Sequence, residues 1–474
     1  MTLSRRHVLG AAATGAALIG LSRFAAAGIS GDGYRNEVYG YGPLKPDPEK
    51  LFDLPEGFSY RVVQRAGDSM SDGLVAPRNM DGMACFRLDG DRVALVRNHE
   101  LSPRHMDQGA FGEGHKLADR IDPKLAYDRN QDGRILPGGT TTLIYDVRRQ
   151  RLEESYLSLA GTSTNCAGGR TPWNSWLTCE EIVRSAGPNA DGHTIQQSHG
   201  WVFDVPAAKK GLAEPIPITG MGRFKHEAVA IDPRTGIAYL TEDEVDGRCL
   251  FYRFLPVDRR APLKGGRLQA LGFKDRSDSR NWKDDAPWSP GEWRDAVWID
   301  LEGVDNTAYD LRDRGHAKGA AWFARGEGIV FGEGELYFTC TSGGPKQLGQ
   351  ILRYRPSRFE GDPREAAEPG RLQLFVEPDD PQVMKMCDNL VLSPAGHLVV
   401  CEDKGIMDGG DYLRGVTPEG RIYSIGRLVL PVGGLSATEL AGACFSPDGS
   451  TLFVNSYSPG FTLAITGPWG RVQA

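Results

Sequence analysis

The sequence predicts an all-β protein, a six-bladed β-propeller with long loop insertions. Three observations predict this fold class. An apolar run with a polar terminus occurs six times, five of the six runs follow an earlier apolar segment across a tight turn, and 60 of the 474 residues are glycine, roughly twice the usual share. Apolar runs bounded by Pro, Asp and Gly are typical of strands joined by hairpin turns. Their repetition at blade-sized intervals indicates a propeller.

The six runs are the expected second strands of six hairpins. They cover residues 92–100, 173–181, 236–244, 335–342, 396–403 and 450–458. The first strands open on polar or small residues, namely Asp81, Asn165-Cys166, His226-Glu227, Glu327, Asp388-Asn389 and Ala441-Gly442. In an antiparallel hairpin, the start of the first strand lies beside the end of the second. If these hairpins surround the central channel, their polar ends meet at one of its mouths.

Residues 1–27 are expected to be a twin-arginine signal peptide rather than part of the fold. The segment 4–10 carries the arginine pair, an apolar stretch follows, and three alanines at 25–27 form a cleavage site. A membrane anchor is the alternative, but the apolar stretch 8–21 is short for a bilayer span. We therefore expect a bacterial protein that the twin-arginine machinery exports to the periplasm or the medium, with no stable membrane anchor.

Residues 28–474 are expected to form a single propeller domain. Charged stretches near 102–139 and 255–320 interrupt the repeats and predict two insertions. The second is expected to pad a blade edge, with a lid over the channel mouth as the alternative. The first contains residues 128–135, which match the first half of an EF-hand calcium loop. The closing acid is missing because Gly139 occupies its position. We therefore expect a solvated turn there, with a peripheral calcium site as the alternative.

Charge and cysteine usage narrow the function classes. The net charge is −7 and no long basic run occurs, which argues against a stable nucleic-acid partner. We expect a small-molecule partner and a monomeric chain.

Most of the eight cysteines lie inside apolar runs, where buried, unpaired thiols are expected. Cys179 differs because Glu180 and Glu181 follow it. Carboxylates alone would raise the pKa of a thiol, whereas a metal ion would deprotonate it.

The polar strand ends contain the side chains of a metal site. They comprise Asp81, His99, Glu100, Cys179, Glu180, Glu181, His226, Glu227, Glu242, Asp243, Glu244, Glu327, Asp388, Asn389, Glu402 and Asp403. So many carboxylates at one mouth would titrate or cost several kcal/mol unless cations compensate them. Oxygen ligands in this number suit calcium, while a thiolate with carboxylates and imidazole suits iron or zinc. For any single acid, simple solvation is a competing interpretation.

A set of motifs resembles the PhoX-type alkaline phosphatase family. The set consists of the twin-arginine leader and residues 176–181, 223–228, 239–243, 325–328, 337–344, 388–389, 401–403, 441–447 and 465–469. No single motif would suffice, but the set is specific, and the resemblance extends over nearly the whole of residues 28–474. The resemblance implies a six-bladed propeller that holds two ferric ions and several calcium ions in its channel.

The resemblance also implies roles for individual residues. Cys179 would be an iron ligand, and Glu227 and Glu327 would bridge metal ions. Arg325 would hold the phosphate oxygens, which suit the guanidinium geometry. The remaining metal ligands implied by the resemblance are Glu180, Asp388, Asn389, Glu402 and Asp403. The implied reaction is metal-assisted hydrolysis of small-molecule phosphate monoesters, with Arg325, Cys179, Glu227 and Glu327 as the catalytic set.

Two other function classes stay open. One is a different calcium-dependent propeller hydrolase, acting on phosphotriesters, phosphodiesters or lactones. Such sites usually need fewer acids and no thiolate, so the segment 179–181 argues against this class. The other is a propeller that binds a ligand or partner without catalysis. That class does not require clustered acids, and analysis of bound metal would distinguish it.

Overall fold

The computed structural model describes residues 35–190, 192–283, 287–403, 410–429 and 438–473. The predicted signal peptide, residues 1–27, lies outside the described residues. Within them, no helix is long and apolar enough to span a membrane.

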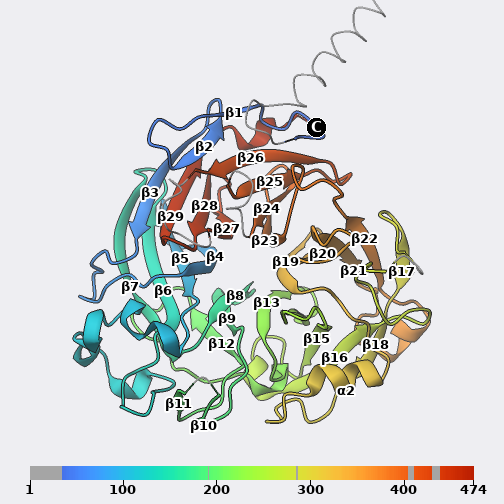
Figure 1. The fold of residues 1–474 in the computed structure, drawn as a ribbon, viewed down its shortest axis with the longest axis horizontal. Coiled ribbons are helices and arrows are strands. Elements are labelled where there is room, and N and C mark those ends of the chain that lie inside the picture. The colour runs from blue at the N-terminus through green and yellow to red at the C-terminus, as the bar shows by residue number, and fades with distance from the viewer. Residues whose placement is uncertain (1–34, 191, 284–286, 404–409, 430–437, 474) are drawn as a thin grey trace, which may run out of the picture.

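Six antiparallel sheets, the blades, stand in a ring around a central axis (Figure 1). Blade 1 contains β4 (Met80–Arg87), β5 (Arg92–His99), β6 (Gly138–Asp146) and β7 (Arg151–Thr162). Blade 2 contains β8 (Asn165–Arg170), β9 (Ser175–Glu180) and β12 (Val202–Pro206). Blade 3 contains β13 (His226–Ile231), β14 (Ala238–Glu242), β15 (Phe251–Pro256), β16 (Gly266–Gly272) and β18 (Val297–Asp300).

The other three blades follow in chain order. Blade 4 contains β19 (Gly326–Gly332), β20 (Glu335–Cys340), β21 (Gln350–Arg355), β22 (Arg371–Val376) and β17 (Trp293–Asp295). Blade 5 contains β23 (Cys387–Leu392), β24 (Leu398–Glu402), β25 (Tyr412–Val416), β26 (Ile422–Leu428), β2 (Phe52–Pro55) and β1 (Leu44–Lys45). Blade 6 contains β27 (Leu440–Phe445), β28 (Thr451–Ser456), β29 (Phe461–Thr466) and β3 (Ser59–Arg65). The predicted fold class is therefore confirmed.

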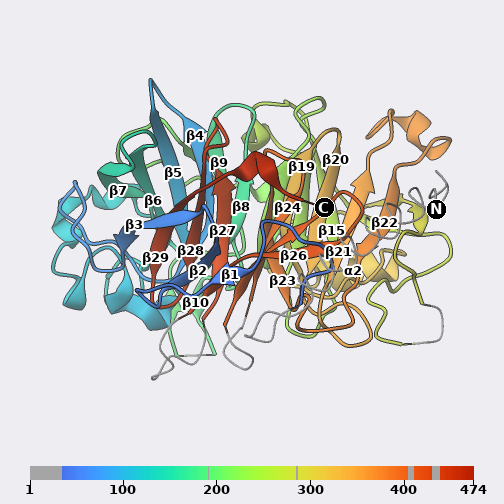
Figure 2. The same ribbon diagram turned by 90° about the horizontal axis from the view of Figure 1, so that it is seen from above.

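The innermost strands β4, β8, β13, β19, β23 and β27 contact one another in sequence around the axis. Figure 2 shows several of them lengthwise. Blade 6 closes the ring, because β3 from the start of the chain pairs antiparallel with β29 near its end. Such closure ties the two ends of the chain together and leaves only the short, protected sheet edges that are typical of propellers.

The predicted hairpin geometry is also observed. His226 at the start of β13 pairs with Glu242 at the end of β14. The same holds for Asn165 with Glu180. The turn between β13 and β14 places Gly236 at φ +77°, a left-handed conformation that favours glycine.

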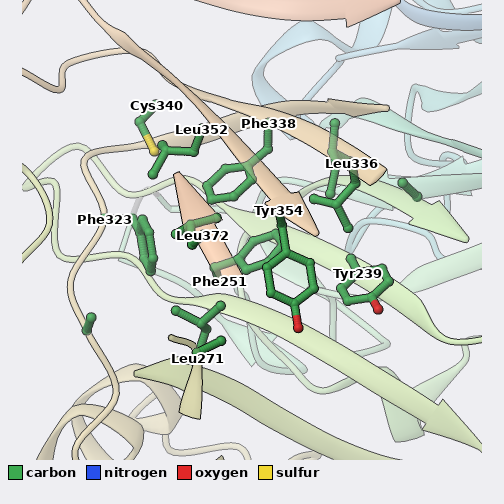
Figure 3. Close-up of a cluster of buried hydrophobic side chains, with 14 of the residues drawn as sticks. Tyr239, Phe251, Leu271, Phe323, Leu336, Phe338, Cys340, Leu352, Tyr354 and Leu372 are labelled. Carbon is green, nitrogen blue, oxygen red and sulfur yellow. The ribbon is translucent and has the colours of Figure 1, made fainter. Parts of the chain in front are cut away.

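Neighbouring blades pack against each other through apolar side chains along the strands, whereas the polar residues lie at the strand ends. Between blades 3 and 4, Phe251 stacks on Phe338 with ring centroids 4.2 Å apart, and Tyr239 and Tyr354 extend the same cluster (Figure 3). Burial of such rings is worth a few kcal/mol each. This packing holds neighbouring inner strands at fixed positions around the channel.

The two charged stretches take different forms. Residues 102–139 contain the 3₁₀ helices η1 (Pro103–Gln108), η2 (Glu113–His115), η3 (Ala118–Arg120) and η4 (Pro123–Leu125). Residues 255–320 supply β16 and β18 to blade 3, β17 to blade 4, and helix α2 (Leu311–Ala317). The remaining short elements are β10 (Gly187–Pro188), β11 (Thr194–Ile195), η5 (Thr219–Met221), η6 (Pro262–Lys264), η7 (Pro363–Ala366) and η9 (Trp469–Arg471).

Candidate metal centre

Every innermost strand has an irregular register near its start. The pairing with the second strand shifts between Met80 and Met83, Asn165 and Gly168, His226 and Val229, Gly326 and Ile329, Cys387 and Leu390, and Ala441 and Cys444. Bulges of this kind redirect side chains and are frequent next to active sites. The first skipped residues are Asp81, Cys166, Glu227, Glu327, Asp388 and Gly442.

The sixth blade contributes a glycine for a steric reason. Gly442 adopts φ +62°, and a Cβ on it would lie 2.4 Å from the carbonyl oxygen of Asp81. The other five blades each place an acid or a thiol at this position. The ring of bulges therefore delivers five potential ligands to the channel.

Two groups of these side chains could each hold a metal ion. One group is Cys166, Glu181 and Glu227, and the other is Glu227, Glu327 and Asp388. Within each group the ligand atoms lie within 4.8 Å of one another. Glu227 belongs to both groups, which is the arrangement that a bridging carboxylate requires. Its Oε1 accepts a hydrogen bond from Cys166 Sγ at 3.2 Å.

Two buried oxygens in this region have no hydrogen-bond partner in the described part of the chain. They are Oε2 of Glu227 and Oδ1 of Asp81. An unpaired buried carboxylate oxygen costs free energy, and coordination of a cation would satisfy it. The donor set therefore fits a group of bound metal ions.

The electrostatics of the metal-free site lead to the same conclusion. Burial, followed by repulsion from Glu327 and Glu181, raises the pKa of Glu227 well above its ordinary value. Burial and then Asp403 raise the pKa of Asp388 to about 7. Burial, Asp81 and Glu227 raise the pKa of the Cys166 thiol well above its ordinary value. Multivalent cations reverse each of these shifts by stabilising the charged forms.

Further acids surround the ligand groups. Burial first, then Asp403 and Asp81, raises the pKa of Glu439 well above its ordinary value. Burial raises the pKa of Glu100 to about 7, and Asp403 and Asp243 contribute to the rise. Asp403, a predicted ligand, thus lies close enough to influence the charge of three other carboxyls.

Arg325 lies beside the second ligand group. Its Nε and Nη2 donate to the two oxygens of Asp243, with an Nη2–Oδ2 distance of 2.6 Å, and Nη2 also donates to Glu327 Oε1 at 3.1 Å. Its Nη1 makes no hydrogen bond to the described residues, and 16% of the side chain is exposed. The guanidinium is therefore fixed in place while one edge stays available.

The structure brings some predicted ligands together and separates others. Glu227, Glu327 and Asp388 form one group, and Asn389 Nδ2 donates to Asp388 Oδ1 at 3.0 Å. Cys179 lies elsewhere: it is fully buried in an apolar cluster with Val202. Because side chains alternate along a strand, Cys179 points between the blades. The thiol at the channel is Cys166, which the sequence reasoning left out.

Glu180 and Glu402 also lie outside the ligand groups, and each accepts hydrogen bonds from its own blade. Glu180 Oε2 accepts hydrogen bonds from the backbone N–H groups of Gly200 and Trp201. Glu402 Oε1 accepts one from Arg414 Nε at 2.8 Å. Of the acids that follow them, Glu181 belongs to the thiol-containing ligand group. Asp403 belongs to neither group, but it contributes to the raised pKa of Asp388. Cys166 occupies the same place at the start of its strand as Asp81 and Glu227 do. This shared place in the sequence pattern could have identified Cys166 as a candidate ligand.

Residues 128–135, which resemble the first half of a calcium loop, direct their polar side chains to partners within the protein. Asn130 Oδ1 and Asp132 Oδ1 accept the backbone N–H of Arg134, and Asp132 forms an ion pair with the side chain of Arg134. Asp128 accepts a hydrogen bond from His199. These carboxylates are engaged within the protein.

The fold and the buried acidic centre define an enzyme-like β-propeller with a site suited to metal ions. Residues 39–460 match the family profile described as alkaline phosphatase PhoX. The chain therefore belongs to the alkaline phosphatase PhoX family and is a phosphatase by family membership.

A comparison with one solved structure agrees on the fold, and a second match is weaker. Pseudomonas fluorescens PhoX in complex with vanadate, a transition state analogue, is 22% identical, with a TM-score of 0.62 over 92% of this chain and 98% of that chain. A gluconolactonase from Xanthomonas campestris is 13% identical, with a TM-score of 0.36 over 90% of this chain and 98% of that chain. No curated protein sequence matches the chain.

Proposed function

We propose that the protein hydrolyses phosphate monoesters at a multinuclear iron and calcium centre in the propeller channel. One observation carries this proposal. Glu227 lies in two ligand groups at once and has a buried oxygen without a partner. A carboxylate so placed can bridge two cations, and pairs of bridged metal ions are a recurrent arrangement in enzymes that hydrolyse phosphate esters.

The ligand types suggest how the metals divide between the groups. Cys166, Glu181 and Glu227 combine a thiol with carboxylates, which suits iron. Glu227, Glu327 and Asp388 offer only oxygen, and the acids around them, including Glu100 and Glu439, suit calcium. When bound, such ions supply Lewis acidity to the phosphoryl oxygens and activate the attacking water.

The chain's own residues position the substrate. Arg325 Nη1 is available to donate to an equatorial phosphoryl oxygen, while Asp243 and Glu327 fix the guanidinium from the other side. Because this donor is oriented before substrate arrives, it stabilises developing charge without reorganisation. Asn389 donates to Asp388 and accepts the N–H of Gly442 at 2.7 Å. Asn389 thereby holds a ligand carboxylate and ties blade 5 to blade 6.

The test is hydrolysis of p-nitrophenyl phosphate by the full-length exported protein, together with analysis of bound metal. We expect bound iron and calcium, with activity that chelation abolishes and calcium restores. If iron and calcium are bound but the ester is not hydrolysed, the metal centre stands and the assigned reaction is wrong. Phosphodiesters and lactones would then distinguish the alternative propeller hydrolases.

We also propose that residues 1–27 direct the protein through the twin-arginine route to the periplasm or the medium, where it acts as a monomer. A variant with both Arg5 and Arg6 changed to Lys should accumulate inside the cell. Export of this variant at the normal rate would contradict the proposed route. Gel filtration of the exported protein tests the monomer.

A further inference from the structure

His199 occupies a closed site between two carboxylates. It is 0% exposed, Nδ1 lies 2.6 Å from Glu180 Oε1, and Nε2 lies 2.9 Å from Asp128 Oδ2. A carboxylate accepts hydrogen bonds and donates none when ionised. Both ring nitrogens therefore donate, and the imidazole carries a positive charge in a charge-assisted pair of hydrogen bonds.

Glu180 connects this histidine to the candidate metal centre. It pairs across the hairpin with Asn165, so the next residues on the two strands are Cys166 and Glu181. These two side chains belong to the thiol-containing ligand group. Any movement of the Glu180–Asn165 pair would displace both ligands together.

Asp128 connects the same histidine to the first charged stretch, residues 102–139. Its Oδ1 accepts the backbone N–H of Gln196 at 3.0 Å. Tyr127 adds a hydrogen bond from its hydroxyl to the carbonyl of Ser198 at 2.7 Å and packs its ring edge-on to His199. The support of His199 thus comes from a segment that contributes no residue to the ligand groups.

The other blades offer an internal comparison. In blade 3, Glu242 accepts hydrogen bonds from the Tyr252 hydroxyl and the Leu250 N–H. In blade 5, Glu402 accepts one from Arg414. These braces use residues of the same blade. Among the described residues, the brace in blade 2 is the one that reaches through a histidine into a separate segment.

We infer that His199 is a positioning residue for Cys166 and Glu181, and that Asp128 anchors it, so that residues 102–139 control how firmly the thiol-containing group holds its metal. This inference rests on the proposed function for the identity of the metal but not for the geometry. The segment therefore acts on the centre from outside it.

The test compares His199→Gln and Asp128→Asn with Arg414→Gln, which weakens the matched brace in blade 5. Gln at 199 can donate toward one carboxylate but not both. In the iron-loaded protein, we expect the two blade 2 variants to lower iron affinity about tenfold or more, the size of effect known for outer-shell partners, and to shift the thiolate-to-iron absorption band. Arg414→Gln should leave that band unchanged.

A second measurement does not depend on metal or activity. In the metal-free protein, the rate at which a thiol reagent labels Cys166 should rise in His199→Gln and Asp128→Asn but not in Arg414→Gln. Equal labelling rates in wild type and all three variants would overturn the inference, even if the phosphatase assignment holds. If iron is absent from the wild type but the labelling rates differ as expected, the proposed function fails and the positioning role stands. Asp128→Asn serves as the milder variant should His199→Gln fold poorly.

Discussion

The two halves of the propeller channel differ although the same six strands line both. At the strand starts, bulges place acids and a thiol toward the axis. Toward the strand ends, the same strands line a cavity of about 620 Å³. Its walls include the small or apolar residues Met83, Ala228, Ile329, Leu390 and Ala443. The difference shows that local register, rather than blade architecture, decides where this channel carries chemistry.

The residue after the first bulged residue of each inner strand marks the boundary between the halves. These residues are Gly82, Ala167, Ala228, Gly328, Asn389 and Ala443. A Cβ on Gly328 would lie 2.6 Å from the Cα of Asn389 on the next blade, so the inner strands approach closely here. Close backbone packing between neighbouring inner strands therefore fixes the candidate ligands in place, in addition to their hydrogen bonds.

The largest contrast is expected between two cysteines. Cys166→Ala should remove bound iron and lower kcat/KM by about three orders of magnitude, because metal-ion catalysis is worth several kcal/mol. Cys179→Ala should keep iron and activity and lose about 1 kcal/mol of stability, because it only trims an apolar cluster. Metal analysis and phosphatase assays of both variants check this. The reverse pattern would restore Cys179 as the ligand.

A smaller loss is expected at Arg325. Lysine retains the charge but cannot hold Asp243 through two nitrogens while presenting a third to the substrate. Arg325→Lys should therefore reduce kcat about 100-fold, as loss of one oriented donor typically does, and leave bound metal unchanged. Steady-state kinetics with p-nitrophenyl phosphate measures it. A change confined to KM would assign Arg325 to ground-state binding instead.

The polar half should also depend on pH through His199. Burial alone would lower the pKa of His199, but Glu180 and Asp128 outweigh it and raise the pKa to about 9. Because the folded pKa lies above the unfolded one, the stabilisation is fully present below about pH 6.5 and is lost as pH rises through about 9. It is on the order of 3 kcal/mol, at about 1.4 kcal/mol per pKa unit.

Urea unfolding at pH 6 and pH 9.5, at a fixed metal load, tests this dependence. Wild type should lose more stability between the two pH values than His199→Gln, which lacks the titrating group. If both proteins respond identically, His199 is not the charged group that stabilises the fold.

Substitutions in the apolar half of the channel should have the smallest effect on bound metal and activity. Ile329→Val removes one methylene from the cavity wall and should cost about 1 kcal/mol in unfolding free energy. Bound metal and kcat should stay at wild-type values. Loss of metal in this variant would show that the two halves of the channel are mechanically coupled.

The fold was predictable because hairpins leave a strong pattern: an apolar run occurs six times, and in five cases an earlier apolar run precedes it across a tight turn. The candidate ligands Glu227, Glu327 and Asp388 were predictable as a group from their shared position at strand openings. Which of two neighbouring residues in a strand faces the channel was not predictable. Side chains of a strand alternate between two faces, and a bulge changes which residue faces the channel. The sequence identifies 179–181 as a polar segment. It does not indicate that Glu181 belongs to a candidate ligand group while Cys179 and Glu180 do not.

The pairing of β3 with β29 has a consequence for how the enzyme is made. The candidate ligands from Asp81 to Asp388 come from five separate blades, and the ring that holds them closes only when a strand near the start of the chain meets one near its end. While a ribosome is still extending the chain, these side chains are distributed over unconnected hairpins. We therefore expect metal ions to bind late, after synthesis of the last blade.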